Sequence, residues 1–490
     1  MTPNPKAATG SAPVSSDTIW TAHDAAQVTG GKAHGAWHAR AISIDSRTVA
    51  KGDLFVALQG DNMDGHRFVA EALAKGAAAA MVSHRPDDVD DHAPLLVVED
   101  TLRGLEDLAR AARARCGGRM IAVTGSVGKT GTKEMLALAC GALGQVHASK
   151  ASYNNHWGVP YTLAQMHAGT DYGIFEIGMN HAGEITPLTQ MVRPHIAIIT
   201  TIAAVHMEHF ESEAAIAAAK AEIFSGIVPG GVAVLNADNP WFETLRHEAA
   251  AKGVSVKSFG ESAQADARLA DVIEAANGSR VKAVILGQEI SFTLAVAGRH
   301  HVQNALAVLL AIGLAGGDIA LAAKALARWD AVGGRGKREL ITIGDKDNPV
   351  TLIDESYNAS PVAMRAAFKV LALIDPGRGG RRIAVLGDMY ELGNDAAKMH
   401  EDLALPLQAA DVQLVYTCGP LMKSLYNKLP PEQRGAHSDD SVELAKIVPD
   451  VLVPGDVVMV KGSRGGGEKP RMQVIVEALR ALPERWRDGK

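Results

Sequence analysis

Short apolar runs alternate with amphipathic stretches from about residue 18 onward. A short apolar run bounded by turn-forming residues is typical of a buried strand, and a period of three to four residues is typical of a helix. In the first part of the chain this pattern predicts one helix over residues 66–75 and a second that opens at Thr101. The strands predicted around them are residues 41–44, 54–58, 77–82 and 95–98.

The alternation continues through the middle of the chain, from a predicted strand at residues 119–123 to about Gly334. Helical patterns separate the apolar runs, which favours βαβ units and a parallel sheet. Residues 281–296 differ, because two short strands joined at Gly287-Gln288 predict a hairpin. The other strands predicted in this block are residues 172–177, 195–202 and 231–235.

The last part of the chain alternates again and predicts a second doubly wound sheet, with strands at residues 350–354, 382–386, 412–417 and 457–460. Residues 1–17 are rich in Pro, Ser, Gly and Ala and are predicted to be a disordered leader. The fold class is therefore α/β with three domains. We predict an N-terminal α/β domain, a central parallel-sheet domain and a C-terminal Rossmann-like domain, at 18–116, 117–336 and 337–490.

Composition narrows the class of protein. The chain has 49 Lys and Arg against 55 Asp and Glu, a net charge of −6, which argues against a nucleic-acid-coating protein or a polybasic membrane binder. The longest uncharged apolar run, residues 305–317, is shorter than the roughly 20 residues of a spanning helix. Cys116, Cys140 and Cys418 lie far apart, so neither a disulfide framework nor a cysteine zinc site is expected. These features predict a cytoplasmic protein without membrane insertion.

The clearest chemical motif is AVTGSVGKTGT at residues 122–132, where a predicted strand runs through a glycine-rich turn into a helix. Lys129 can supply positive charge to the β- and γ-phosphates, and the Thr130 hydroxyl can reach Mg²⁺. The longer P-loop pattern has a glycine where this chain has Val123, so this is the G-x-x-G-K-T form; the alternative is a glycine-rich turn with an unrelated lysine. The central domain is thus predicted to be a P-loop, ATPase-like domain. Its predicted ATP-binding residues are Gly125, Ser126, Val127, Gly128, Lys129, Thr130 and Gly131.

Two more candidates follow strands of the same predicted sheet: Glu176 ends the run YGIFE, and His206 follows the run that ends at Ile202. Ligands of open α/β sheets bind beyond the carboxyl ends of the strands. A carboxylate and an imidazole beside a triphosphate favour Mg²⁺ coordination, although either residue alone is more simply a solvated loop residue. The segment from His206 to His209 lacks the H-E-x-x-H spacing of a zinc site.

Lys220 lies in the helical stretch SEAAIAAAKAEIF. On these residues alone we predict a solvated lysine beside Glu213 and Glu222. The alternative is a buried lysine, which can lose its proton and become reactive.

Taken together, these motifs resemble those of the Mur ligases, the ATP-dependent amino-acid ligases of peptidoglycan precursor synthesis. The likeness extends from about Ile42 to Val474 and includes motifs in each predicted domain. These motifs are SIDSRTVAKGDLFVALQGDNMDGHRF, VTGSVGKTGTKEM, ASYNNHWGVPYTL, FEIGMNHAGEI, AAVHMEHF, AKAEIF, AGRHHVQNALA, GGRGKRE, IDESYNASPVAMRAA, AVLGDMYELG and VKGSRG.

The resemblance implies how the central site works. Lys129 and Thr130 would hold the ATP phosphates and magnesium, with Glu176 and His206 as further metal ligands. Lys220 matches a lysine carbamylated by CO₂, a modification that supplies an anionic oxygen ligand near a second magnesium ion. The implied cofactors are therefore ATP, two Mg²⁺ ions and a carbamylated lysine.

Other positions are implied in the same way. Arg335 matches an arginine that reaches the terminal phosphate from the domain junction. The family pattern has Asn where this chain has His301. The remaining implied contacts are His300, Asn304, Asp354 and Asn358 at the nucleotide, Ser46 and Arg47 at a uridine diphosphate, and Asn154 and Asn155 on a substrate-facing loop.

The C-terminal motif DESYNASP indicates which reaction the resemblance implies. Family members that add a third amino acid have Asp-Tyr-Ala-His there and often an Asn-Pro-Arg motif later, and this chain has neither. The implied substrates are UDP-N-acetylmuramoyl-tripeptide and D-alanyl-D-alanine, joined through an acyl phosphate, with Lys461 and Arg464 as candidates for the dipeptide side. The implied N-terminal domain binds the UDP-sugar, and a monomer is expected. The alternatives are a Mur ligase that adds a single amino acid and a catalytically inactive nucleotide-binding regulatory module.

Overall fold

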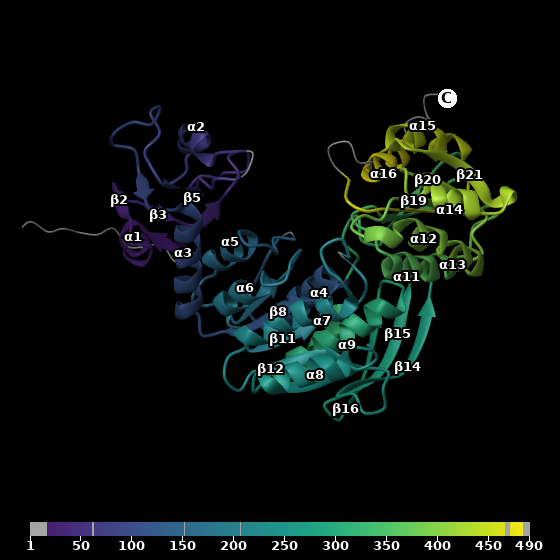
Figure 1. The fold of residues 1–490 in the computed structure, drawn as a ribbon, viewed down its shortest axis with the longest axis horizontal. Helices are drawn as coiled ribbons and strands as arrows, with labels where there is room; N and C mark the ends of the chain where they lie inside the picture. The colour runs from purple at the N-terminus through teal and green to yellow at the C-terminus, as the bar shows by residue number, and fades with distance from the viewer. Residues whose placement is uncertain (1–16, 61–62, 151, 206, 466–470, 484–490) are drawn as a thin grey trace, which may run out of the picture. The chain divides into compact units, whose positions relative to one another are not determined.

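The computed structural model describes residues 17–60, 63–150, 152–205, 207–465 and 471–483 (Figure 1). The chain divides into two compact units: Met1–Gly118 with Ser149–Gly173, and Arg119–Ala148 with Ile174–Lys490. This division is coarser than the predicted one, which stays a prediction, and it groups residues 149–173 with the N-terminal part. All of the predicted leader except Asp17 lies outside the described residues.

The first unit contains a five-stranded sheet in the order β2-β7-β6-β5-β4. Strands β4 to β7 are parallel to their neighbours, and β2 pairs antiparallel with β7. The strands are β2 (Lys32–His34), β4 (Ala41–Ser43), β5 (Asp53–Val56), β6 (Ala79–Val82) and β7 (Leu95–Val97), beside a separate pair of β1 (Trp20–Thr21) and β3 (His38–Ala39). The helices are α1 (Ala22–Thr29), α2 (Val69–Ala74) and α3 (Thr101–Arg115).

The structure has two elements where one helix was predicted over residues 66–75. A 3₁₀ turn, Gly65–Phe68, comes first, and α2 follows it. Inside this turn the buried His66 ring bonds Asp64 Oδ1 at 2.7 Å and accepts the Ser83 N–H at 2.9 Å. These bonds hold the His66 side chain inward, which suits the tighter turn.

Trp20 links residues 149–173 to the rest of the first unit. Its indole N–H donates to the Ala164 carbonyl of α5 (Gly158–Ala164) at 2.9 Å, and its side chain is 2% exposed. The Arg115 guanidinium, at the end of α3, lies 4.1 Å from the ring centroid. Helices α3 and α5 also contact each other directly.

We expect Trp20→Ala to destabilise the first unit by about 3–5 kcal/mol, because it leaves a cavity and an unsatisfied carbonyl. Hydrogen exchange of the intact chain checks this: protection should fall in α3 and α5 while the strands of the second unit keep theirs. A uniform loss of protection, or none, would contradict this role for the indole.

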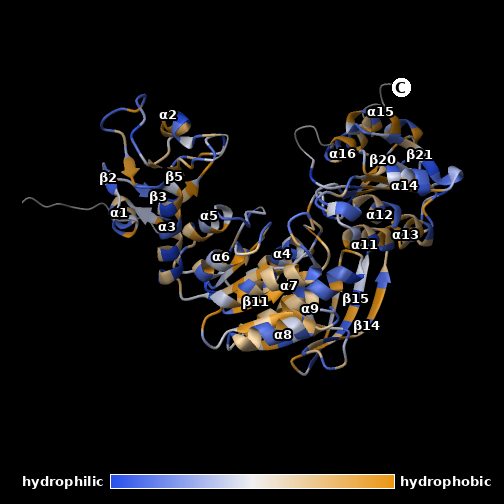
Figure 2. Ribbon diagram, viewed as in Figure 1, coloured by the Kyte–Doolittle hydropathy of each residue, from blue (hydrophilic) through white to orange (hydrophobic). Residues whose placement is uncertain are grey.

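The second unit contains a nine-stranded sheet in the order β16-β15-β14-β13-β12-β11-β8-β10-β9. Strands β8, β11, β12 and β13 are parallel to one another, as predicted for βαβ units. Every residue of β11 is apolar and buried, and this strand has a hydrophobic colour in Figure 2. The strands are β8 (Arg119–Thr124), β9 (Val146–Ala148), β10 (Tyr172–Glu176), β11 (Ile196–Ile199), β12 (Val232–Asn236) and β13 (Ser255–Gly260).

Beyond β13 the sheet becomes largely antiparallel. Strands β15 (Gly278–Ile285) and β16 (Gln288–Leu294) form the predicted hairpin, and Leu286 and Gly287 at its turn both have positive φ. β14 (Ala267–Ala275), which pairs antiparallel with β15, was not among the predicted strands. Its charged residues, the half-buried Arg268 and Glu274 and the exposed Asp271, interrupt the strand, so it has no continuous apolar run.

Helix α9 (Arg299–Leu314) is the central helix of this unit. It contains most of the longest apolar run and contacts α4 (Lys129–Gly141) and strands β11 to β15. Within the described residues, no helix is both long and apolar enough to cross a membrane. The other helices here are α6 (Ile185–Val192), α7 (Glu213–Ala221), α8 (Phe242–Ala251) and α10 (Ile319–Leu326).

A six-stranded sheet in the order β17-β18-β22-β19-β20-β21 follows. The predicted doubly wound arrangement holds: five strands are parallel, helices cover both faces, and only β17 at one edge is antiparallel. Both edge strands are only partly buried and were not among the predicted strands: β17 (Lys337–Ile341) and β21 (Arg434–Ser438). The inner strands are β18 (Val350–Glu355), β19 (Arg382–Gly387), β20 (Leu414–Cys418) and β22 (Val457–Lys461).

The helices of this sheet form two layers. Those on one face are α11 (Pro361–Ala372), α12 (Ala396–Glu401), α13 (Ala404–Ala409) and α14 (Lys423–Lys428). Those on the other face are α15 (Ser441–Val451) and α16 (Gln473–Arg480). Because the helix after β22 lies on the opposite face from the helices after its neighbours β18 and β19, the carboxyl end of β22 is a topological switch point, the place where open α/β sheets usually bind ligands.

Candidate functional site

The glycine-rich turn lies between the carboxyl end of β8 and the first residue of α4, as predicted. Gly128 has φ +88° and precedes the helix, so its backbone adopts a conformation that a side chain would strain. Thr200, which the sequence analysis missed, braces the turn: its hydroxyl donates to the Val127 carbonyl at 2.6 Å. The Ser126 N–H donates to the Thr201 carbonyl at 2.8 Å. Thr200 lies inside the strand predicted at residues 195–202, so no local signal marked it, whereas the observed β11 ends one residue before it.

Lys129 reaches back across this turn. Its Nζ donates to the Gly125 carbonyl at 2.6 Å and to the Ser126 carbonyl at 3.4 Å. Burial lowers the pKa of Lys129, the Glu176 charge raises it, and the Arg335 charge lowers it. Lys129 therefore shares one electrostatic environment with both residues, and carbonyl-bound Nζ is held where a phosphate group would meet it.

Gly125 cannot carry a side chain. Its φ is +144°, and a Cβ there would stand 2.0 Å from the Thr200 hydroxyl oxygen. We expect Gly125→Ala to distort the turn, to cost roughly 1–3 kcal/mol of stability and to weaken ATP binding at least tenfold. Calorimetric titration with a non-hydrolysable ATP analogue checks this. Gly117→Ala, where a Cβ meets nothing within 4 Å, is the matched control and should bind as the parent does.

Two oxygen ligands meet beside the turn. Thr130 Oγ1 donates to Glu176 Oε2 at 2.9 Å, and the two side chains are 5% and 2% exposed. Glu176 ends β10 as predicted, so the structure brings the first residues of α4 and this strand end together. His206 lies outside the described residues. The hydroxyl and carboxylate are the hard oxygen donors that Mg²⁺ prefers.

Lys220, in the last turn of α7, is 1% exposed. The prediction of a solvated lysine from its local sequence is therefore wrong, because that reading could not see what covers α7. Burial lowers the pKa of Lys220 well below its ordinary value, and the Lys129 charge lowers it further. Burial of this kind favours the neutral, nucleophilic form of the amine.

The start of α9 faces the same turn. Asn304 is 7% exposed, and its amide nitrogen would stand 3.1 Å from a Cβ at Gly128. His300 and His301 have ring centroids 3.9 Å apart, and His301 lies 5.0 Å from the Trp329 ring. Burial lowers the pKa of both histidines, so they are neutral near pH 7. The structure thus brings the predicted Asn304 to the turn itself.

Arg335 lies in a short segment that pairs with the end of β18. The Tyr357 N–H donates to the Gly334 carbonyl at 3.0 Å, and the Gly336 N–H donates to the Asp354 carbonyl at 2.8 Å. The Arg335 guanidinium carbon lies 4.1 Å from the Tyr357 ring centroid. Sequence analysis gave no role to Tyr357, since an aromatic residue in a loop has no local signal.

The other predicted C-terminal residues lie around β18 and β22. Asp354 is buried, accepts the Ser356 hydroxyl at 2.6 Å and pairs with Arg480 at 2.9 Å. Lys461 is buried and pairs with Glu355 at 2.9 Å. The Lys461 ammonium also donates to the carbonyl of the exposed Asn358. Arg464 is exposed, with its guanidinium carbon 5.7 Å from the Tyr357 ring centroid.

The two predicted uridine-diphosphate contacts and the two residues of the predicted substrate-facing loop all fall in the first unit. The Ser46 carbonyl accepts the Lys75 ammonium at 2.8 Å, and exposed Arg47 pairs with Asp45 at 2.6 Å. Asn155 Oδ1 accepts the Gly158 N–H at 2.9 Å, capping α5, and the Asn154 N–H donates to the Ser152 carbonyl.

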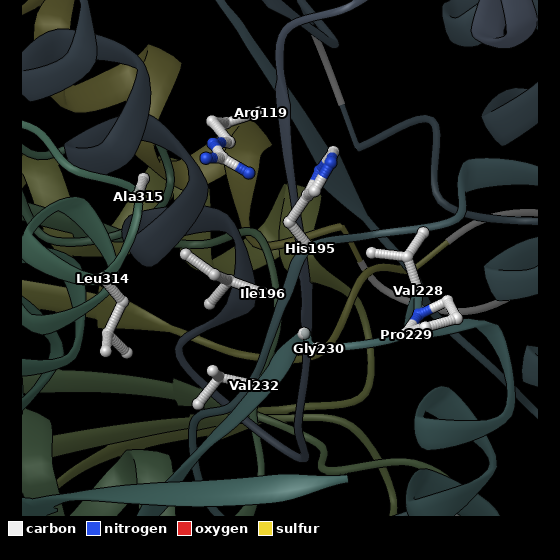
Figure 3. A pocket seen from close by; sticks show the side chains of 10 residues that line it. Arg119, His195, Ile196, Val228, Pro229, Gly230, Val232, Leu314 and Ala315 are labelled. Atoms are coloured by element: carbon white, nitrogen blue, oxygen red, sulfur yellow. The ribbon is translucent and has the colours of Figure 1, made fainter.

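A cavity of about 110 Å³ opens at the other end of the central strands (Figure 3). Arg119, Ile196 and Val232, which begin β8, β11 and β12, line it together with the end of α9. Ligand pockets usually measure roughly 300 Å³ or more. Of the predicted site residues that the structure describes, none lines this cavity, which lies at the amino ends of β8, β11 and β12, away from the glycine-rich turn.

The fold and the glycine-rich turn define a P-loop α/β protein with a second α/β sheet. Family models match three parts of the chain: the Mur ligase family catalytic domain at 38–113, the Mur ligase middle domain at 123–312 and the Mur ligase glutamate ligase domain at 340–464. The chain therefore belongs to the Mur ligase family.

Individual relatives agree with this assignment. UDP-N-acetylmuramoyl-tripeptide–D-alanyl-D-alanine ligase of Rickettsia prowazekii is 34% identical, over 91% of this chain and 97% of its own. The ligase of the same name from Escherichia coli is 35% identical, over 90% and 93%. A crystal structure of MurF from Acinetobacter baumannii is similar with a TM-score of 0.81 at 29% identity, covering 95% and 99% of the two chains. MurF of Thermotoga maritima, solved in complex with ADP, has a TM-score of 0.75 at 26% identity, over 91% and 98%.

Proposed function

We propose that this protein is an ATP-dependent ligase that joins UDP-N-acetylmuramoyl-tripeptide to D-alanyl-D-alanine, a step of peptidoglycan precursor synthesis. The observation that carries the proposal is the junction of β8 and α4, where Lys129 lies on the turn and Thr130 bonds Glu176. The relatives whose names state this activity align over more than nine-tenths of their own length. The alignment therefore includes the parts of those relatives that correspond to all three matched family domains.

The chemistry follows from the substrates. A carboxylate lacks a leaving group, so ATP transfers its γ-phosphoryl group to the terminal carboxylate of the tripeptide and ADP leaves. The dipeptide amine then attacks the carbonyl carbon, phosphate leaves with the C–O bond electrons, and the nitrogen loses a proton. Lys129 and Arg335 supply positive charge where the phosphoryl group moves. Closure around the acyl phosphate would exclude water, which otherwise hydrolyses it.

We propose that two magnesium ions bind at this site. The Thr130 hydroxyl and Glu176 carboxylate, 2.9 Å apart and buried, suit a hard cation. The amine of Lys220 does not suit a magnesium ion, but a carbamate on Lys220 would offer two oxygen atoms. Burial of Lys220 favours the neutral amine, which is the form that adds to CO₂. When bound, magnesium neutralises charge on the transferring phosphoryl group. His206 completes the proposed ligand set.

The proposed ligand assignments follow the units. Ser46, Arg47, Asn154 and Asn155 lie in the unit that would hold the UDP-sugar. His300, Asn304, Asp354 and Asn358 would contact the nucleotide, and Lys461 and Arg464 would lie on the dipeptide side. The proposed domains remain 18–116, 117–336 and 337–490. We place the reaction in the cytoplasm, where ATP is made, and all three cysteines are buried free thiols. We also propose that the protein acts as a monomer.

Phosphate release tests the function. With ATP, Mg²⁺ and UDP-N-acetylmuramoyl-tripeptide, we expect release only when D-alanyl-D-alanine is added, together with the pentapeptide product by mass spectrometry. Release with a single amino acid would indicate the other type of Mur ligase. No release with any amine would indicate a nucleotide-binding module without catalysis.

A further inference from the structure

Two arginines that the proposed function uses separately share one aromatic ring. The guanidinium carbons of Arg335 and Arg464 lie 4.1 Å and 5.7 Å from the Tyr357 ring centroid. The face of an aromatic ring carries partial negative charge and attracts cations within about 6 Å. Two guanidinium groups repel each other, so holding both near one ring requires a compensating attraction, which the ring supplies.

The backbone fixes Tyr357 and Arg335 to each other. The hydrogen bonds on either side of Arg335, from Tyr357 to Gly334 and from Gly336 to Asp354, pair its segment with the end of β18. A Cβ at Gly334, where φ is +78°, would stand only 2.9 Å from the Tyr357 Cβ. The two segments are therefore in direct contact, and the Arg335 backbone follows the C-terminal sheet.

Arg464 reaches the ring from the neighbouring strand. Glu355 of β18 and Lys461 of β22 are register partners, and their side chains pair at 2.9 Å. Tyr357 lies two residues beyond Glu355, and Arg464 three beyond Lys461. This joined pair of strand ends fixes where both side chains start, at the carboxyl ends of β18 and β22.

Arg335 also links the ring to the phosphate-binding turn. Its charge acts on Lys129, whose Nζ lies on that turn. Arg464 is exposed and follows β22 at the switch point. Tyr357 thus lies against one cation whose charge acts at the turn and one that follows the switch point.

We propose that Tyr357 is a positioning residue that holds Arg335 for the phosphoryl group and Arg464 for the carboxylate of the incoming dipeptide. The inference rests on the proposed function. Tyr357 itself would not touch the reacting atoms; it would set the spacing between the two anion-binding side chains. The part of Tyr357 that matters is its ring face, so phenylalanine should substitute for it and an aliphatic residue should not.

A double-mutant cycle tests this inference. Tyr357→Leu should lower kcat roughly tenfold, leave the KM for ATP within about twofold and raise the KM for D-alanyl-D-alanine, whereas Tyr357→Phe should keep most of the rate. Combined with Arg335→Ala, Tyr357→Leu should lower kcat no further, because the ring acts through that arginine. Combined with Arg464→Ala, it should raise the dipeptide KM no further.

If the effects of the two substitutions multiply in either cycle, on kcat with Arg335→Ala or on the dipeptide KM with Arg464→Ala, Tyr357 does not act through that arginine. A Tyr357→Phe variant as impaired as Tyr357→Leu would also contradict the inference. Tyr426→Leu is the matched control, since half-buried Tyr426 lies 5.6 Å from Arg434 on the same sheet and should not affect kcat or either KM. Should Tyr357→Leu fail to fold, Tyr357→Gln enters the same cycles. If the parent protein itself fails to release phosphate with the dipeptide, the proposed function fails rather than this inference.

Discussion

Replacing Lys129 with alanine is expected to lower kcat by roughly 10³-fold, the loss typical of removing a main charge partner of a transferring phosphoryl group. The ammonium of Lys129 bonds two carbonyls of the phosphate-binding turn, so it is already in place before ATP arrives. The alanine variant loses this preorganised charge while the turn keeps its brace from Thr200. Single-turnover ADP formation with saturating substrates measures the effect.

Lys324→Ala provides the control, because Lys324 is exposed in the last turn of α10 and should leave the rate and the melting temperature as they are. The Lys129→Ala protein should melt within a few degrees of the parent, which separates lost chemistry from lost folding. A Lys129→Ala protein that still forms ADP at a tenth of the parental rate would remove the ammonium from the mechanism.

Replacing Lys220 with methionine is expected to lower kcat roughly 10²-fold. Methionine fills a similar volume in the buried site without an amine, so the fold should survive while the anionic ligand is lost. Millimolar acetate or formate should restore part of the rate, because either supplies a carboxylate in place of the carbamate. Lys220→Arg should remain inactive with either anion, since arginine places a permanent charge close to Lys129.

Isotope-labelled carbon dioxide gives a second readout of the same hypothesis. The parent protein should show a carbamate carbonyl resonance that the Lys220→Met protein lacks. Burial lowers the pKa of Lys220 and so favours the neutral amine that adds to CO₂, whereas protonation removes that form; the carbamate signal should therefore weaken as the pH is lowered. Full activity of Lys220→Arg would show that no anion is needed at this position.

How much the sequence predicts depends on how local each signal is. The strand, turn and helix around Lys129 are adjacent in the chain, and the structure places them as predicted. β14 and β21 were missed because partly exposed strands lack an apolar run. Each forms a strand because it pairs with a neighbouring strand, β15 for β14 and β20 for β21. Lys220 was misread as solvated for the same reason: its local sequence is that of an exposed helix, and the elements that bury it lie elsewhere.

The site shows the same limit. A charge pattern along the chain cannot reveal that Thr200 braces the turn or that Tyr357 lies against two guanidinium groups, because these contacts join separate strand ends. Resemblance to a family supplied Arg335 and Asn304, which periodicity alone would have left as a loop arginine and a polar residue in an apolar helix.

The place of β22 has a consequence for biosynthesis. This strand is made after β18, β19, β20 and β21, yet it lies between β18 and β19. While it is still inside the ribosome, β18 and β19 have no partner along the edges they will share with it. The C-terminal sheet must therefore wait for β22 before it can close, and a nascent chain is without the Lys461–Glu355 ion pair until that moment. Ribosome pausing just before β22 should thus expose two bare inner strands and make this part of the chain a client for chaperones.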